Sequence, residues 1–299
     1  LYDEDPDPED PNTRKALEKL QGQLLKPKNN ELPLILRRMK EKVFKGVGPD
    51  GSPIPKKNIH PASVTCQMMP PEQAGLYIEY SNKLHAGQAS VIEALHAWKR
   101  ISLCPRNLDD WEGHGDLVES SARLNEVFRL LDEIHAKNEK VLLFVESRKI
   151  QPILAQLVKE RYGLLRLPLT INGAVSGAGR QIAVNKFQTD MDGFNAIIIS
   201  PKAGGVGLTL TAANHVIHIE RWWNPAVEDQ CNDRSYRIGQ KKDVHIYTPM
   251  ARHPDFGEKS FDLVLDAILT RKRGLAANLF IPTELNLRRD FDIMFEESQ

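Results

Sequence analysis

Hydrophobic residues in the second half of the chain alternate between helical spacing and short, unbroken apolar runs. Residues 121–135 carry apolar side chains at helical intervals, and residues 141–145 (VLLFV) form a continuous apolar run. Such a run is typical of a strand buried on both faces of a parallel sheet. Strands alternating with helices predict an α/β fold with a doubly wound parallel sheet. The expected strands are residues 141–145, 169–172, 196–200, 216–220 and 244–247, and the expected helices are residues 121–135, 150–162, 179–187 and 225–236.

The first half of the chain begins with a segment that cannot form a core. Residues 3–11 contain six carboxylates and three prolines, and this composition predicts a solvated linker. A helical pattern and then a turn-rich stretch follow, and after them come a short strand and two helices that we expect to form a small insert. These segments are residues 13–45, 46–55, 63–68, 71–80 and 89–101, in that order.

Composition limits the classes of partner. Lys+Arg and Asp+Glu both number 40, so no overall positive field favours nucleic acid, and any DNA surface has to be local. The three cysteines are scattered without a CxxC pair, and we expect neither disulfides nor a metal site. No apolar run approaches the roughly 20 residues of a membrane helix. We therefore expect an intracellular protein with no membrane partner. Because the first residue is not Met, we interpret the chain as a piece of a longer polypeptide.

The helix predicted from residue 225 has the clearest boundaries in the chain. Asn224 is a good N-cap, Pro225 suits the first turn and Gly239 is a stop signal. This helix is expected to present one amide and two guanidinium groups on a single face.

Those three groups belong to Gln230, Arg234 and Arg237, at positions i, i+4 and i+7. Two adjacent guanidinium groups favour an anion between them, and a polyphosphate suits their bidentate geometry. The alternative is a solvated helix in which neighbouring acids pair with the arginines. These acids are Glu228, Asp229 and Asp233.

A glycine-rich loop directly follows the predicted strand at residues 196–200. Gly204, Gly205 and Gly207 lie in it, at the strand's carboxyl end, where open α/β sheets bind ligands. Glycines let backbone N–H groups approach a phosphate closely. No Gly-Lys-Ser/Thr follows, so the loop is not a Walker A loop, and the third glycine of a dinucleotide fingerprint is missing. The alternative is a tight turn.

These stretches together resemble the second RecA-like domain of the Swi/Snf family of ATPases, the chromatin-remodeller branch of superfamily two helicases. KVLLFVES (residues 140–147) resembles helicase motif four, and SPKAGGVGLTLTAANHVI (residues 200–217) resembles motif five. WWNP and QCNDRSYRIGQ (residues 222–225 and 230–240) resemble the family's W-N-P element and motif six. The ending DRxxRIGQ is highly specific to this branch.

The flanking segments fit the same resemblance. LILRRMKEKV and VTCQMMPPEQAGLY resemble the linker between the two lobes, and SFDLVLDAILTRKRGLAANLF resembles the brace helix that follows the second lobe. Asn172 stands where the family usually has Asp, and Tyr236 replaces a common His, which suggests a divergent, bacterial member. We divide the chain into an acidic linker (1–12), an inter-lobe linker with a helical insert (13–119), a RecA-like helicase C-terminal domain (120–250), and a brace helix with a tail (251–299).

The resemblance implies a cleft between two lobes, with ATP and Mg²⁺ held mainly by an N-terminal RecA-like lobe of the same polypeptide that is absent from this chain. Arg234 and Arg237 would reach across the cleft as arginine fingers, with Gln230 in the same catalytic set. The nucleotide side of the cleft would be lined by Gly205, Val206 and Gly207.

Residues 132–135 spell the DExH of a Walker B box. We interpret them as part of a helix, because the apolar stripe of residues 121–135 continues through them, whereas a Walker B box ends a buried strand. Without Walker A and Walker B motifs, this chain alone is expected to be inactive.

The resemblance also implies a sequence-independent grip on double-stranded DNA, made through its phosphates. Trp222 and Trp223 could contact DNA or couple the cleft to it, and core packing is the alternative for one of them. The DNA-binding residues that we expect are Ser147, Arg148, Asn172, Gly173, Arg180, Ser200, Lys202, Trp223 and Asn224.

The function that follows is the second lobe of an ATP-dependent translocase on double-stranded DNA. One alternative is the lobe of a strand-separating helicase, and another is a non-catalytic nucleic-acid-binding scaffold. Intact Arg234 and Arg237 argue against a scaffold. A dinucleotide-binding oxidoreductase is excluded by the missing fingerprint glycines.

Overall fold

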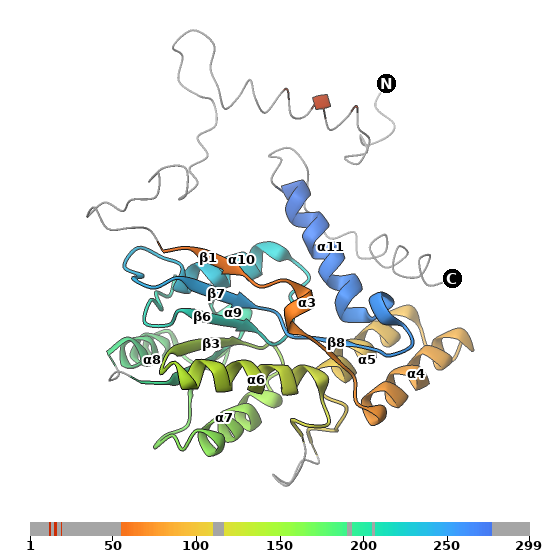
Figure 1. Ribbon diagram of the computed structural model, residues 1–299, viewed down its shortest axis with the longest axis horizontal. Helices are drawn as coiled ribbons and strands as arrows, with labels where there is room; N and C mark the ends of the chain where they lie inside the picture. The colour runs from red at the N-terminus through yellow and green to blue at the C-terminus, as the bar shows by residue number, and fades with distance from the viewer. Residues whose placement is uncertain are drawn as a thin grey trace. The chain divides into compact units, whose positions relative to one another are not determined.

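The computed structural model describes residues 12, 15, 16, 19, 55–109, 117–189, 193–204 and 207–276 (Figure 1). The described residues of Pro55–Asp266 belong to one compact unit, and those before and after it belong to a second. The sheet and the segments that resemble helicase motifs lie in the first of these units.

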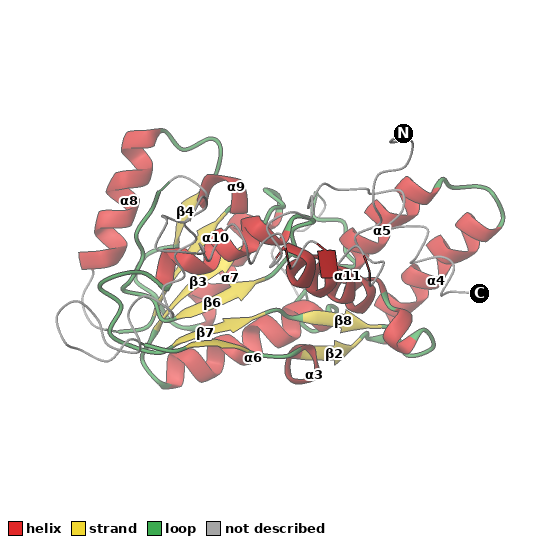
Figure 2. Cartoon of the chain, turned by 90° about the horizontal axis from the view of Figure 1, so that it is seen from above, coloured by secondary structure: helices red, strands yellow, loops and turns green. Residues whose placement is uncertain are grey.

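Six parallel strands form the main sheet, in the order β1-β7-β6-β3-β5-β4. Figure 2 shows them running side by side in one direction. Because every pairing in this sheet is parallel, each connection is a crossover through a helix or a long loop. The strands are β1 (Lys57–Ile59), β3 (Lys140–Phe144), β4 (Leu169–Ile171), β5 (Asn195–Ile199), β6 (His215–His218) and β7 (Val244–Tyr247).

Helices cover both faces of this sheet, as a doubly wound fold requires. Successive residues of the central strand β3 alternate between two separate cores. Val141 and Leu143 pack with α6 (Ala122–Ala136) and α7 (Ile150–Arg161). Leu142 and Phe144 lie in the opposite core. The helices of that opposite core are α8 (Gly177–Thr189), α9 (Pro201–Gly204) and α10 (Pro225–Ser235).

Two further helices, α4 (Pro71–His85) and α5 (Val91–Leu103), belong to the same compact unit as the sheet. Ser90 and Glu93 form a reciprocal capping box that fixes the start of α5. The helix predicted at residues 89–101 is confirmed as α5, in which Ile101 is fully buried and Ile92 is 63% exposed.

The strand predicted at residues 63–68 is wrong in its first half. Ala62–Thr65 is a short helix, α3, and only Cys66–Met68 is a strand, β2. β2 pairs in parallel with β8 (Met250–Arg252) in a separate two-stranded sheet. β1 and β8 were not predicted from the sequence, because KNI and MAR contain neither an apolar run of strand length nor a hydrophobic alternation.

Two buried arginines hold the start of the last helix, α11 (Phe261–Ala276). Arg123 of α6 pairs with Asp262, whose second carboxylate oxygen accepts from the backbone N–H of Ala251 at 2.8 Å. Arg221 pairs with both Asp266 and Glu228, at 2.8 Å from Nε to Oε1 of Glu228. These contacts join α6 and α10 to the first two turns of α11. The short helix η1 (Gly257–Lys259) precedes it.

No described helix combines the length and the apolar character that crossing a bilayer requires.

Candidate functional site

Helix α10 is fixed at its start by the residues that the sequence singled out. The Asn224 side chain accepts a hydrogen bond from the backbone N–H of Ala226 at 2.9 Å, and Pro225 occupies the first turn. In the middle of the helix, Asn232 Oδ1 lies 2.7 Å from Nε2 of His218 on β6. The helix is therefore tied to the sheet beneath it.

The prediction that Gln230, Arg234 and Arg237 share one helical face is wrong for Arg237. The helix ends at Ser235, because Tyr236 has a ψ of 67° and leaves the helical conformation. Arg237 lies in the following turn, where its backbone N–H donates to the carbonyl of Ser235 at 2.9 Å. The two arginines are close neighbours even so.

The Arg237 guanidinium reaches the glycine-rich loop that follows β5. Its Nη1 donates to the carbonyl oxygens of Gly207 at 3.2 Å and Leu208 at 3.3 Å. Gly207 has a positive φ of 53°, a conformation that favours glycine. The backbone N–H of Leu210 donates to the carbonyl of Arg234 at 2.9 Å. The two segments that resemble motifs five and six are thus joined directly.

Electrostatics sets Arg234 apart from a solvated arginine. Burial and the positive charge of Arg237 lower the pKa of Arg234, and together they outweigh the opposite influence of Cys231 and Asp233. A site where two guanidinium groups oppose each other is stabilised when an anion binds between them. Gln230 is exposed on the same helix. Three residues of the glycine-rich loop were expected at the nucleotide. Gly207 lies beside Arg237, and Gly205 and Val206 lie outside the residues that the structure describes.

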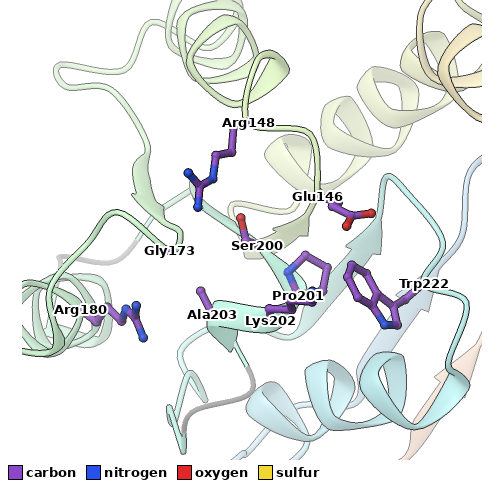
Figure 3. A pocket seen from close by; sticks show the side chains of 9 residues that line it. All are labelled: Glu146, Arg148, Gly173, Arg180, Ser200, Pro201, Lys202, Ala203 and Trp222. Atoms are coloured by element: carbon purple, nitrogen blue, oxygen red, sulfur yellow. The ribbon is translucent and has the colours of Figure 1, made fainter. Parts of the chain in front are cut away.

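A second feature is a hollow of about 430 Å³ at the carboxyl ends of β3, β4 and β5, which we name the loop-edge hollow (Figure 3). Three loops that are distant in sequence meet there. Five of the residues predicted to bind DNA line it: Arg148, Gly173, Arg180, Ser200 and Lys202. The remaining lining residues are Glu146, Pro201, Ala203 and Trp222.

Neighbouring groups hold two of the cations in place. The Lys202 Nζ lies 5.3 Å from the centre of the Trp222 ring, a cation–π arrangement. Arg180 Nε donates to the carbonyl of Val175 at 2.9 Å. Glu146, the one carboxylate in the lining, pairs with Lys99 at 2.7 Å. The lining therefore presents three cations, and its one acid already has a partner.

Gly173 brings two of the loops into contact. A Cβ at this position would lie 2.7 Å from Nη2 of Arg148, so the guanidinium rests directly against the glycine backbone. A side chain here would displace Arg148.

The other residues predicted to bind DNA lie outside the lining of this hollow. Ser147 lines a neighbouring hollow beside α5, and its backbone N–H donates to Glu220 at 2.7 Å. Trp223 is half-buried with its ring edge-on to Phe261. The Asn224 side chain is the N-cap of α10. Asn172 donates to Gln151 at 2.9 Å and accepts from the backbone N–H of Ala174 at 3.0 Å. Of the two tryptophans, Trp222 is the one that lines the hollow.

Gln151 was not predicted as a site residue. It is buried at the edge of this region, donates a hydrogen bond to Ser200 and accepts one from Asn172. Its position early in a predicted helix gave no signal that distinguished it from an ordinary helical residue.

Residues 132–135 lie within helix α6, as predicted, and not at the end of a strand. Asp132 pairs with Arg161, and Glu133 pairs with Arg129. In the part of the chain that the structure describes, no three His, Cys, Asp or Glu side chains are grouped so that they could hold a metal ion.

Comparison with known proteins finds similarity over part of the chain. The model of the helicase conserved C-terminal domain matches residues 123–239. Zorya protein ZorD of Escherichia coli O139:H28 (strain E24377A / ETEC) is 37% identical over 184 residues, which are 60% of this chain and 17% of ZorD. The putative ATP-dependent helicase/translocase YwqA of Bacillus subtilis (strain 168) is 42% identical over 132 residues, which are 44% of this chain and 14% of YwqA. The chain thus spans a small part of these relatives.

Solved structures agree on the fold. The Sulfolobus solfataricus SWI2/SNF2 ATPase core in complex with double-stranded DNA superposes with a TM-score of 0.58 at 25% identity, covering 81% of this chain and 49% of that one. The C-terminal part of the Fun30 ATPase domain superposes with a TM-score of 0.60 at 20% identity, covering 82% of this chain and 99% of that one. The predicted fold and the family resemblance are both confirmed.

Proposed function

Since the chain carries a helicase conserved C-terminal domain of the SWI2/SNF2 type, we propose that it is the second lobe of an ATP-dependent translocase on double-stranded DNA. The observation that carries the proposal is the placement of Arg234 and Arg237 beside the loop after β5. Two like charges are held together there, with Arg237 bonded to the loop carbonyls.

These arginines act on ATP that the N-terminal lobe holds. Their guanidinium groups bind phosphate oxygens and stabilise the negative charge that develops on the transferring phosphoryl group. Mg²⁺, held with ATP by that other lobe, supplies further neutralisation of the phosphates when it is bound. Gln230 and the loop around Gly207 complete the nucleotide side of this lobe, together with Gly205 and Val206. This chain alone is inactive, because it lacks the lobe that carries the Walker motifs.

The loop-edge hollow is the DNA-backbone site in this proposal. Three cations converge on it: Arg148 from the loop after β3, Arg180 from α8 and Lys202 from α9. Cations with backbone N–H groups recognise phosphates without reading bases. The residues proposed to contact ATP lie at the same edge of the sheet. Both ATP and DNA therefore contact the segment that follows β5. Ser147, Asn172, Trp223 and Asn224 support these loops or contact the flanking DNA.

The shared edge of the sheet couples ATP hydrolysis to the grip on DNA. Closure of the cleft on ATP brings Arg234 and Arg237 to the phosphates, and opening after hydrolysis releases them. Because the loop after β5 joins both sites, each cycle changes how the two lobes grip one DNA strand. The result is a directional step along the duplex.

The test is the ATPase activity of the full-length protein, measured with and without double-stranded DNA. Wild type is compared with Arg234→Ala and Arg237→Ala, and with Arg166→Ala as a matched control, since Arg166 is an exposed arginine before β4, at the opposite edge of the sheet. We expect DNA to stimulate wild type and the control. Each site variant should lose about a thousandfold in turnover, roughly 4 kcal/mol, while still binding nucleotide.

Turnover that ignores DNA, or that survives both substitutions, would overturn the proposal in favour of a nucleic-acid-binding scaffold. A strand-displacement assay on the same protein separates translocation from unwinding. A translocase that does not separate strands hydrolyses ATP on duplex DNA and releases no single strand.

A further inference from the structure

Gln151 lies in the first turn of α7 and is 1% exposed. Both ends of its side-chain amide are used. Its Nε2 donates to the Val145 carbonyl at 3.2 Å and to Ser200 Oγ at 2.8 Å, and its Oε1 accepts from Asn172 Nδ2 at 2.9 Å. One buried side chain therefore makes three hydrogen bonds to three separate segments.

These three segments are the ends of β3, β4 and β5. Val145 directly follows β3, Asn172 directly follows β4 and Ser200 directly follows β5. Each loop that begins there supplies residues to the loop-edge hollow, including Arg148, Gly173 and Lys202. Gln151 thus cross-links the bases of these three loops.

The chemistry of the link permits little variation. The Val145 carbonyl is only an acceptor, so the amide nitrogen of Gln151 has to face it, and the amide oxygen then faces Asn172. The residue at position 172 must therefore be a donor. A carboxylate there would place two acceptors against each other in a partly buried site, which is costly.

We propose that Gln151, together with Asn172, is a positioning residue for DNA binding: it holds the three loops in the geometry that accepts the phosphate backbone. This inference rests on the proposed function and deepens it. It assigns the Asn172 side chain to the loop scaffold and leaves the phosphate contacts to the cations of the hollow. Loops that are ordered before DNA arrives lose less conformational entropy on binding.

The molecule contains a matched control in Gln73 of α4. This second buried glutamine is fully buried, donates to the carbonyls of Ile101 at 2.7 Å and Ser102 at 3.4 Å, and accepts from the backbone N–H of Ala122 at 2.9 Å. Its bonds join α4, α5 and the start of α6, and none of these partners lines the loop-edge hollow. Removing either amide should cost similar stability.

The experiment uses the full-length protein carrying Gln151→Leu, Gln73→Leu or Asn172→Asp. Binding to a duplex oligonucleotide is measured by fluorescence anisotropy, DNA-stimulated ATPase gives KM for DNA and kcat, and thermal unfolding gives Tm. Both leucine variants should lower Tm by a similar amount, on the order of 5 °C. Only Gln151→Leu and Asn172→Asp should raise Kd and KM for DNA, by about tenfold, with kcat at saturating DNA retained.

A variant with Arg148→Ala separates failure of this inference from failure of the proposed function. If Arg148→Ala weakens DNA binding while Gln151→Leu and Asn172→Asp bind DNA as Gln73→Leu does, the positioning role is wrong and the DNA site stands. If Arg148→Ala also binds DNA like wild type, the DNA site itself is wrong. Asn172→Asp changes only one atom of the side chain, so it decides the question even if Gln151→Leu does not fold.

Discussion

Arg123 and Arg221 lie beside carboxylates, whereas Arg234 and Arg237 lie near each other. Arg123 and Arg221 are buried, with 2% and 4% of their side chains exposed, and each contacts a carboxylate. Although burial opposes it, Glu228 and Asp266 raise the pKa of Arg221. Burial and Arg237 instead lower the pKa of Arg234. Carboxylates within the chain neutralise the buried arginines, which stabilises the fold. Two guanidinium groups held near each other would instead favour an anion between them.

The largest effect that this comparison predicts is on stability. Arg221→Ala removes the guanidinium that pairs with the buried carboxylate of Glu228. We therefore expect the free energy of unfolding to fall by about 3–5 kcal/mol. Chemical denaturation measures it. Arg237→Ala, at an exposed position, should change stability by less than about 0.5 kcal/mol. Equal losses in the two variants would remove the distinction between the pairs.

Arg237→Lys tests the other pair, and its effect is on turnover. Lysine keeps the charge but loses the planar fork that binds two phosphate oxygens. We expect DNA-stimulated ATP turnover to fall about a hundredfold, roughly 3 kcal/mol, with thermal unfolding unchanged. Full activity in this variant would mean that charge alone suffices at this position.

Replacing both members of a buried pair should cost less than removing one. In the double variant Arg123→Met with Asp262→Leu no charge remains buried, but the backbone N–H of Ala251 loses its acceptor. We expect a loss of about 2 kcal/mol in the free energy of unfolding. A cost above that of Arg123→Ala alone, measured by the same denaturation, would contradict this account.

The smallest effect is expected at an exposed pair. Lys57 and Asp233 lie 3.2 Å apart, and 61% of the Asp233 side chain is exposed. Lys57→Ala should lower the free energy of unfolding by at most about 1 kcal/mol, and the loss should shrink at high salt. Denaturation at two salt concentrations checks both points.

The parts of the fold that the sequence predicted correctly are those with a long or repeated pattern. The apolar run of β3 and the stripe of α6 identified a parallel sheet between helices, and the Asn224-Pro225 start of α10 is found as expected. β1 and β8 were missed, because their three residues become strands only by pairing with distant segments.

The candidate site shows the same division between local and distant information. Five residues that line the loop-edge hollow were named together from the family resemblance, and their binding of DNA stays a prediction. Arg237 lies outside the helix because of the conformation of Tyr236, and it donates to the Gly207 carbonyl, 30 residues earlier in the chain. Neither feature is visible in the local sequence. That Gln151 joins three loops depends on the sheet order, which no local pattern contains.

The edge strand β1 has a consequence for synthesis of the protein on the ribosome. Lys57 pairs with Val244, so the sheet stays incomplete until nearly two hundred further residues have emerged. Parallel pairing over such a separation is slow to form, and β7 keeps an open edge until β1 docks. A polypeptide starting at residue 120 would lack both β1 and β2 and would leave the edges of β7 and β8 open to aggregation. β1 and β2 therefore cover strand edges that would otherwise stay open.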